Sequence, residues 1–156
     1  VEVVTAVGIS TILITVIFAL QNFILDQQQY AFNSYLSVET ANAAMQTLEK
    51  EIKNSRQGAN GAYQLEEASD QQLIIYSNAD NDDNVERIRY FLDGTNLNKG
   101  VTDPTAYPFS YPTENEQITT LNEHIRNGSQ PIFRYYNSDW PSDTTNNPLP
   151  IGNRLS

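Results

Sequence analysis

Four carboxylates lie close together in the sequence, at Asp80, Asp82, Asp83 and Glu86. Calcium favours several carboxylate oxygens gathered on a tight turn, so this spacing could form a cation site. The segment lacks the central glycine and the distal glutamate of a helix–loop–helix calcium site. We therefore interpret it as the solvated tip of a hairpin and expect no metal; calorimetry with Ca²⁺ distinguishes the two.

The rest of the chain offers little reactive chemistry. Its single histidine, His124, stands in the polar stretch NEHIRNG with no flanking pattern of ligands, which is typical of a solvated surface residue. The motifs G-x-S-x-G and H-E-x-x-H and a phosphate-binding glycine loop are absent. The lack of cysteine excludes a disulfide framework, a thiolate metal cage and a cysteine nucleophile. We expect no catalytic residue, no cofactor and no enzymatic activity.

The charge balance argues against nucleic acid as a partner. The chain has 156 residues, with 9 Lys and Arg against 19 Asp and Glu, and a net charge of −10. A surface that binds phosphates needs clustered cations, which this composition does not supply. The length suits one domain of ordinary size.

The most unusual feature is an apolar segment at the start. The 18 residues from Val3 to Leu20 carry no charge, and Phe23, Ile24 and Leu25 extend the run. Such a segment is long enough to cross the hydrocarbon core of a bilayer as a helix. A cleavable signal peptide would have a basic start, whereas the first basic residue here is Lys50. A buried helix of a soluble protein would show a polar stripe, so a membrane-spanning helix is the preferred interpretation.

Glu2 stands at the head of this apolar run. A carboxylate buried there costs a few kcal/mol, roughly, unless it is paired. It is either an interfacial residue in contact with water or a residue that pairs with a cation on another chain. The sequence leaves both alternatives open.

The helix is predicted to continue beyond the apolar run. Neither proline nor glycine occurs from Asp26 to Arg56, and Gly58 and Gly61 provide a stop. One stripe at helical spacing should pack on the rest of the chain; it comprises Val38, Ala41, Met45, Leu48 and Ile52. We therefore predict an apolar half over residues 1–25, an amphipathic half over 26–57 and a polar head over 58–156.

The head is predicted to contain a small antiparallel sheet. Strands are expected at Gln72–Ser77, Val85–Leu92 and Pro131–Asn137, the first two joined by the turn NADNDDN. Residues 101–116 contain three prolines and are expected to form a loop, while 117–125 are ambiguous between strand and short helix. The predicted class is α+β, with the long helix packed on this sheet.

Aromatic residues gather in the second half of the head. In one interpretation Phe133 and Tyr135 belong to the core and the other rings anchor long loops. The alternative is an interaction loop, because exposed tyrosine and tryptophan are common at interfaces and can stack on sugars. The candidates for that loop are Tyr107, Phe109, Tyr111 and Trp140.

Taken together, these features resemble the type IV pilins and the pseudopilins of type II secretion. In that family a membrane prepilin peptidase removes a short basic leader just before a motif of the form Phe-Thr-Leu-x-Glu, and Val1-Glu2-Val3-Val4 matches the motif's end and continuation. The segments MQTLEKEI, IRYFLDG and PIFRYYN look like the J-type minor pseudopilins. Two departures are the lack of a proline within the apolar run and the lack of a C-terminal disulfide.

The resemblance implies a structural role. Glu2 would pair with the N-terminal amine of a neighbouring subunit, and the apolar half would sit first in the cytoplasmic membrane, with the head outside, and then in a periplasmic or extracellular filament. Its partners would be other pilin-like subunits. Residues for packing in the filament core would be Val4, Val7, Ile12, Leu13, Val16, Ile17 and Leu20.

The resemblance also leads to expectations about the two ends of the chain. The mature protein is expected to begin a few residues before Val1 and to continue past Ser156, which an intact mass would test. The rival hypothesis is a single-pass adhesin or sensor that binds a glycan or a protein through its aromatic loops.

Overall fold

The computed structural model describes residues 2–80, 82–123, 125–151 and 154. Within them the chain forms one long helix, one short 3₁₀ turn and a five-stranded antiparallel sheet. The predicted α+β class is therefore confirmed. Two compact units are present, Val1–Glu39 and Thr40–Ser156, so the boundary falls inside the helix.

The helix α1 spans Glu2–Lys53. It ends where the backbone tightens, since the amide of Asn54 donates to the carbonyl of Lys50 at 3.0 Å and that of Ser55 to Ile52 at 3.2 Å. The amide of Arg56 then donates to the carbonyl of Tyr76 at 2.9 Å, which joins the chain to the sheet. The predicted end near Arg56 agrees to within one turn.

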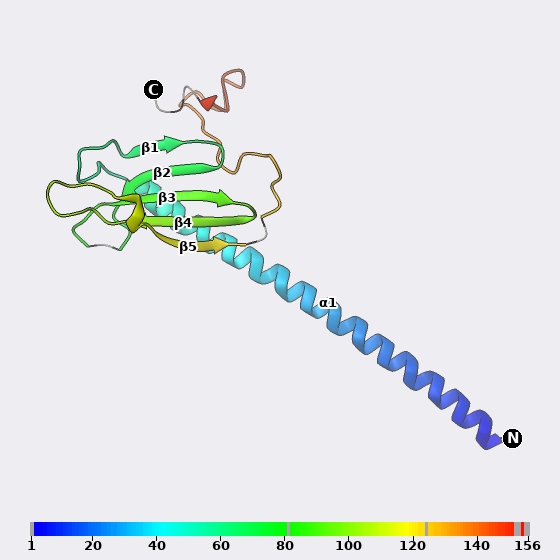
Figure 1. The fold of residues 1–156 in the computed structure, drawn as a ribbon. Helices are drawn as coiled ribbons and strands as arrows, with labels where there is room; N and C mark the ends of the chain where they lie inside the picture. The colour runs from blue at the N-terminus through cyan, green and yellow to red at the C-terminus, as the bar shows by residue number, and fades with distance from the viewer. Residues whose placement is uncertain (1, 81, 124, 152–153, 155–156) are drawn as a thin grey trace. The chain divides into compact units, whose positions relative to one another are not determined.

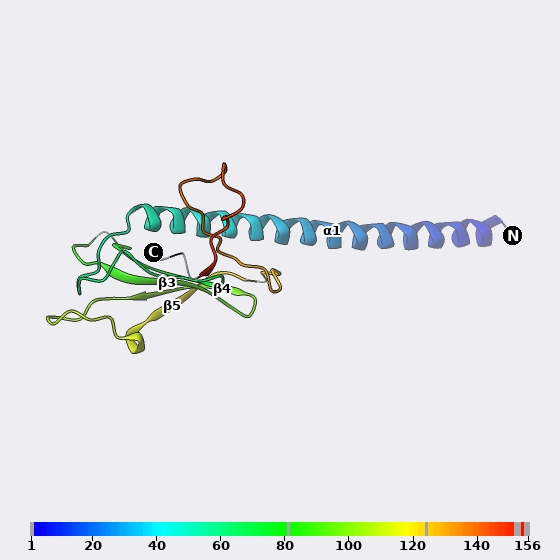
Figure 2. The same cartoon turned by 90° about the horizontal axis from the view of Figure 1, so that it is seen from above.

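The sheet is a simple meander in which each strand pairs with the next along the chain (Figure 1). Its strands are β1 (Leu65–Ala68), β2 (Gln72–Ser77), β3 (Glu86–Asp93), β4 (Asn96–Thr102) and β5 (Gln117–Asn122). The 3₁₀ turn η1 (Thr113–Asn115) precedes β5. Figure 2 shows the last turns of α1 along one face of this sheet.

The core lies on the face of the sheet that meets the helix. Leu73 and Ile75 of β2 stand opposite Tyr90 and Ile88 of β3 and form one buried cluster. Leu48 of α1 packs against that cluster. Alternation of apolar and polar side chains along β2 and β3 dictates this arrangement, because neighbouring residues of a strand face opposite sides.

The strands of the head differ from the prediction at Pro131–Asn137 and at β4. Pro131–Asn137 is not a strand, so that prediction was wrong. The amides of Ile132 and Phe133 both donate to the carbonyl of Asp70, at 3.0 and 3.1 Å, so the segment attaches by single bonds rather than a ladder. The strand β4 was missed because NLNKGVT is polar and contains glycine, and its first two positions follow a turn.

The strands β1 and β5 lie at the two edges of the sheet. The four-residue strand β1 was also missed, because LEEA carries no alternating apolar pattern. The ambiguous segment 117–125 forms β5 over Gln117–Asn122. As predicted, Phe133 and Tyr135 pack against the core.

The face of α1 that packs on the sheet differs from the predicted stripe. Ala44 and Glu51 are buried there, with Leu48 between them. Met45 and Ile52 remain 60% and 41% exposed, so the expectation that they pack on the head was wrong. The stripe was misplaced because an acidic residue, Glu51, occupies a central position of the packed face.

Glu51 is the polar link between the helix and the sheet. Its side chain is buried and accepts hydrogen bonds from the hydroxyl of Tyr90 on β3 and the ammonium of Lys99 on β4. Tyr90 and Lys99 are direct neighbours in the β3–β4 ladder, so both donors converge on one carboxylate. Burial, followed by the hydrogen bond and charge of Glu51, raises the pKa of Tyr90, which therefore stays a donor.

Ion pairs cover the opposite face of the sheet. Arg87 binds Glu66 through two bonds of 2.9 and 2.6 Å. Arg89 binds Glu116, whose carboxylate lies directly over Gly100, where any Cβ atom would collide with it. The Arg87–Glu66 pair thus joins β3 to β1, and the Arg89–Glu116 pair fixes the residue before β5 onto the sheet.

Replacing Glu51 with Gln should weaken the head. Lys99 would lose its counter-ion in a site where its side chain is 13% exposed, at a cost of about 3–5 kcal/mol in the free energy of unfolding. The double variant Glu51→Met with Lys99→Met should recover most of that loss, because it removes both buried charges. Urea denaturation of the detergent-solubilised chain measures both effects.

Glu49→Gln is the matched control. Glu49 lies two residues away and pairs with Lys53 in water, so its replacement should leave the free energy of unfolding unchanged. Equal stability of the Glu51→Gln variant and the parent chain would contradict the role assigned to Glu51.

Candidate functional site

The first half of α1 presents a long apolar surface. The segment Glu2–Gln29 is long and apolar enough to cross a membrane, and none of its most apolar window is buried within the chain. Its 28 residues span about 42 Å, more than the roughly 30 Å of a hydrocarbon core. Every predicted packing residue is exposed: Val4, Val7, Ile12, Leu13, Val16, Ile17 and Leu20.

The hydroxyl groups of this segment are satisfied within the helix itself. Ser10 donates to the carbonyl of Ala6 at 2.9 Å and Thr15 to that of Thr11 at 2.8 Å, and Thr5 and Thr11 bond in the same way. A polar group in lipid costs free energy unless it is hydrogen-bonded. These four side chains therefore let the helix face lipid or another apolar helix without an unpaired hydroxyl donor.

Glu2 begins the helix and is exposed. A carboxylate in the first turn interacts favourably with the helix dipole and its free amides. Among the ion pairs formed between described residues, none includes Glu2. The fold of the described chain thus does not engage this carboxylate with a cation of its own.

The predicted aromatic residues separate into two groups. Tyr107 and Phe109 share a loop, where their rings meet edge to face at 6.2 Å. Trp140 contacts Tyr136 instead, with ring centroids 4.7 Å apart. Tyr111 is held to the fold, since its hydroxyl donates to the carbonyl of Val85 at 2.6 Å and accepts from the amide of Ala59 at 2.9 Å.

The loop that carries Tyr107 and Phe109 is closed on itself. The amide of Thr105 donates to the carbonyl of Ser110 at 2.9 Å, and the amide of Ser110 donates to the hydroxyl of Thr105 at 3.0 Å. Tyr107 is nevertheless 87% exposed. An ordered loop with an exposed ring presents apolar surface at little further entropic cost, which suits recognition.

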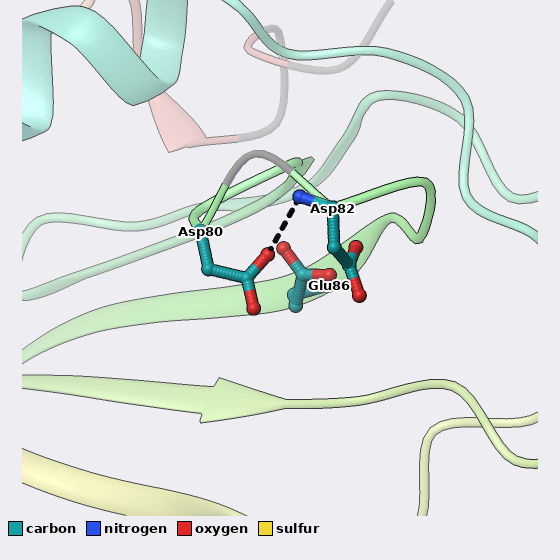
Figure 3. Close-up of side chains that lie close together, drawn as sticks. All are labelled: Asp80, Asp82 and Glu86. Carbon is teal, nitrogen blue, oxygen red and sulfur yellow. Dashed lines mark hydrogen bonds between the residues drawn. The ribbon is translucent and has the colours of Figure 1, made fainter.

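The acidic hairpin gathers three carboxylates. One oxygen from each of Asp80, Asp82 and Glu86 lies within 4.8 Å of the others, and Figure 3 shows the three side chains converging at the β2–β3 turn. Asp83 is not part of this group. Such a group could offer oxygens to a hard cation. His124, interpreted from the sequence as a solvated surface residue, lies outside the described residues.

Backbone amides already use several of these oxygens. The amide of Ala79 donates to Glu86 at 2.6 Å, that of Asp82 to Asp80 at 3.1 Å and that of Asn84 to Asp82 at 2.6 Å. The carboxylates therefore shape the turn, in line with the interpretation as a hairpin tip. Burial raises the pKa of Glu86, and the charges of Asp80 and Asp82 raise it further.

Sequence reasoning missed the residues that fix the head to the helix. Glu51 looked like one of several solvated acids near Lys50 and Lys53, and nothing in its spacing distinguishes it from Glu49. Tyr90 and Lys99 could be related to it only after β4 had been placed beside β3. The periodicity of Ala44 and Leu48 is the one local signal that points to this face.

Comparison of the chain with models of protein families, with curated proteins and with solved structures finds no match.

The Asp80→Asn variant should lower the pKa of Glu86. It removes one repelling charge yet keeps the side-chain oxygen that binds the amide of Asp82. Asp83→Asn, outside the group, should leave that pKa unchanged. NMR titration of the Glu86 side-chain carboxyl carbon measures the difference, and equal shifts in both variants would contradict the geometry of the cluster.

Glu86→Gln should stabilise the head at neutral pH. The folded-state pKa of Glu86 is raised above its unfolded value, so the ionised carboxylate weakens the fold. The stability associated with the protonated carboxyl is fully present below the unfolded pKa and is lost as pH rises through the folded pKa. The melting temperature of the variant should exceed that of the parent at pH 7, with an advantage that shrinks towards pH 4. A variant that is less stable at pH 7 would refute this.

Proposed function

We propose that the chain is a pilin-like structural subunit that assembles into a filament through the apolar half of α1. The observation that carries the proposal is the apolar surface of Glu2–Gln29, which the fold leaves entirely uncovered. A surface of this size needs lipid or other apolar helices around it. The acidic residue at its head and the small antiparallel head that follows support the same role.

The work of this subunit is association rather than catalysis. Before assembly the helix lies in the membrane, and after assembly it packs against the helices of neighbouring subunits. Transfer from lipid to a helix bundle gains little hydrophobic free energy, because both surroundings are apolar. Close packing of the exposed apolar side chains must then hold the subunits together. A polar group must specify the axial register between neighbouring helices.

Glu2 is the group that specifies the register in this proposal. In apolar surroundings a carboxylate requires a cation, and the N-terminal amine of the next subunit is the partner that the resemblance to type IV pilins implies. The same resemblance makes prepilin peptidase the maturation enzyme and places the head on the outer side of the cytoplasmic membrane. The head segments favour a minor, J-like subunit in a periplasmic or extracellular filament.

One observation favours the second candidate function. The closed loop around Tyr107 and Phe109 holds exposed aromatic surface in a fixed shape, as an adhesin or sensor anchored by one helix would need. That function does not require Glu2 to have a partner. The role of Glu2 therefore separates the two candidates.

Glu2→Ala should block filament formation without releasing the chain from the membrane, because the apolar surface is unchanged while the residue that sets the register is lost. Filament yield by electron microscopy should fall at least tenfold, and membrane fractionation should be normal. Glu39→Ala, a charge change elsewhere on the exposed surface of α1, is the control. An unchanged filament yield in the Glu2→Ala variant would refute the assignment and favour the anchored adhesin.

A further inference from the structure

A cavity opens beside β1 at the edge of the sheet. Its volume is about 610 Å³, within the range of roughly 300–1,000 Å³ that is usual for small-ligand sites. The residues that line it are Ala62, Tyr63, Gln64, Leu65, Glu66 and Arg154. Five of them are consecutive, so the shape of the cavity depends on the segment that leads into β1.

That segment is held rigidly. The amide of Gly58 donates to the carbonyl of Ala62 at 3.0 Å, and the side-chain amide of Gln57 donates to the carbonyl of Gly61 at 3.0 Å. Gly61 has a φ of 86°, a conformation that favours glycine and allows the turn. One residue beyond Tyr63, the carbonyl of Gln64 accepts a bond from the amide of Tyr76.

The ring of Tyr63 is not used by the fold. Tyr63 is 88% exposed although its backbone lies between these anchored residues. An aromatic ring held at the wall of a cavity offers a flat apolar face and a hydroxyl that can form hydrogen bonds. The side-chain amide of Gln64, beside it, is exposed and offers both a donor and an acceptor.

The two charged groups of the cavity are already neutralised. The carboxylate of Glu66 is bound by Arg87 and by the hydroxyl of Tyr76. The guanidinium of Arg154 is bound to Asp70 at 2.6 Å and to the carbonyl of Ala68 at 3.2 Å. Because both groups are paired, they are fixed in position. They give the cavity hydrogen-bonding groups without an unpaired charge that would attract an ion.

We infer that this cavity binds a neutral carbohydrate, with a sugar ring stacked on Tyr63 and its hydroxyl groups bonded to Gln64 and Glu66. A pyranose has an apolar face of C–H groups and a rim of hydroxyls, which matches an aromatic wall beside an amide and a fixed carboxylate. The paired charges argue against an ionic ligand. The inference is independent of the assembly role proposed above, because the cavity lies wholly within Thr40–Ser156.

The test is titration of the whole chain, solubilised in a detergent without a sugar headgroup, with maltotriose, cellotriose and chitotriose. Isothermal calorimetry and saturation-transfer NMR should detect binding of at least one trisaccharide at millimolar concentration or below. The Tyr63→Ala and Gln64→Ala variants should each bind at least tenfold more weakly. The control is Tyr35→Ala, which removes a tyrosine of α1 that is 65% exposed and lies outside both the cavity and the aromatic loops, and it should leave the affinity unchanged.

Tyr63 is so exposed that its truncation should preserve the fold, and circular dichroism checks this. Three results would overturn the inference: no binding of any of the three sugars, undiminished binding by Tyr63→Ala, or an equal loss in Tyr35→Ala. If no sugar binds and Tyr63→Ala reduces filament yield instead, the cavity is a contact between subunits. If Glu2→Ala loses filaments but still binds sugar, the sugar site is supported independently of the assembly role.

Discussion

The need to keep water away from one half of α1 governs the rest of this molecule. The segment Glu2–Gln29 exposes a mainly apolar surface, with no charge from Val3 to Leu25, and its serine and threonine hydroxyls bond to the helix backbone. Burial of each large aliphatic side chain gains about 1.5–3 kcal/mol relative to water, so no state with this surface in water can compete. Lipid and neighbouring helices are the two surroundings that satisfy it.

The C-terminal end of the same helix packs on the head instead of being exposed. There α1 must be fixed to a polar head, and the buried carboxylate of Glu51 receives two donors from adjacent strands. Apolar packing by Leu48 is non-directional, whereas a carboxylate between Tyr90 and Lys99 fixes rotation and translation together. This arrangement ties the helix end to the centre of the sheet, as a subunit held by its helix would require.

The sequence was sufficient to predict the elements with strong periodicity. It was insufficient to predict those that form only through tertiary pairing. The long helix and the strands β2 and β3 follow from apolar runs and strict alternation. The polar β4 forms because β3 offers it a partner edge. PIFRYYN, despite its strand-like composition, attaches through two amide bonds to Asp70 and through the packing of Phe133 and Tyr135. The Tyr63 cavity could not be foreseen, because its walls depend on Arg154, which is remote in sequence.

The most direct test of the account is the environment of the apolar helix before and after assembly. The chain has no cysteine, so Leu13→Cys introduces a unique thiol on the exposed apolar surface, and Tyr63→Cys provides a water-exposed control on the head. The account predicts that a membrane-impermeant maleimide labels only the control, and that mild oxidation cross-links Leu13→Cys between chains in filaments but not in dispersed membranes. Rapid labelling of Leu13→Cys in both states, without a cross-link, would contradict it.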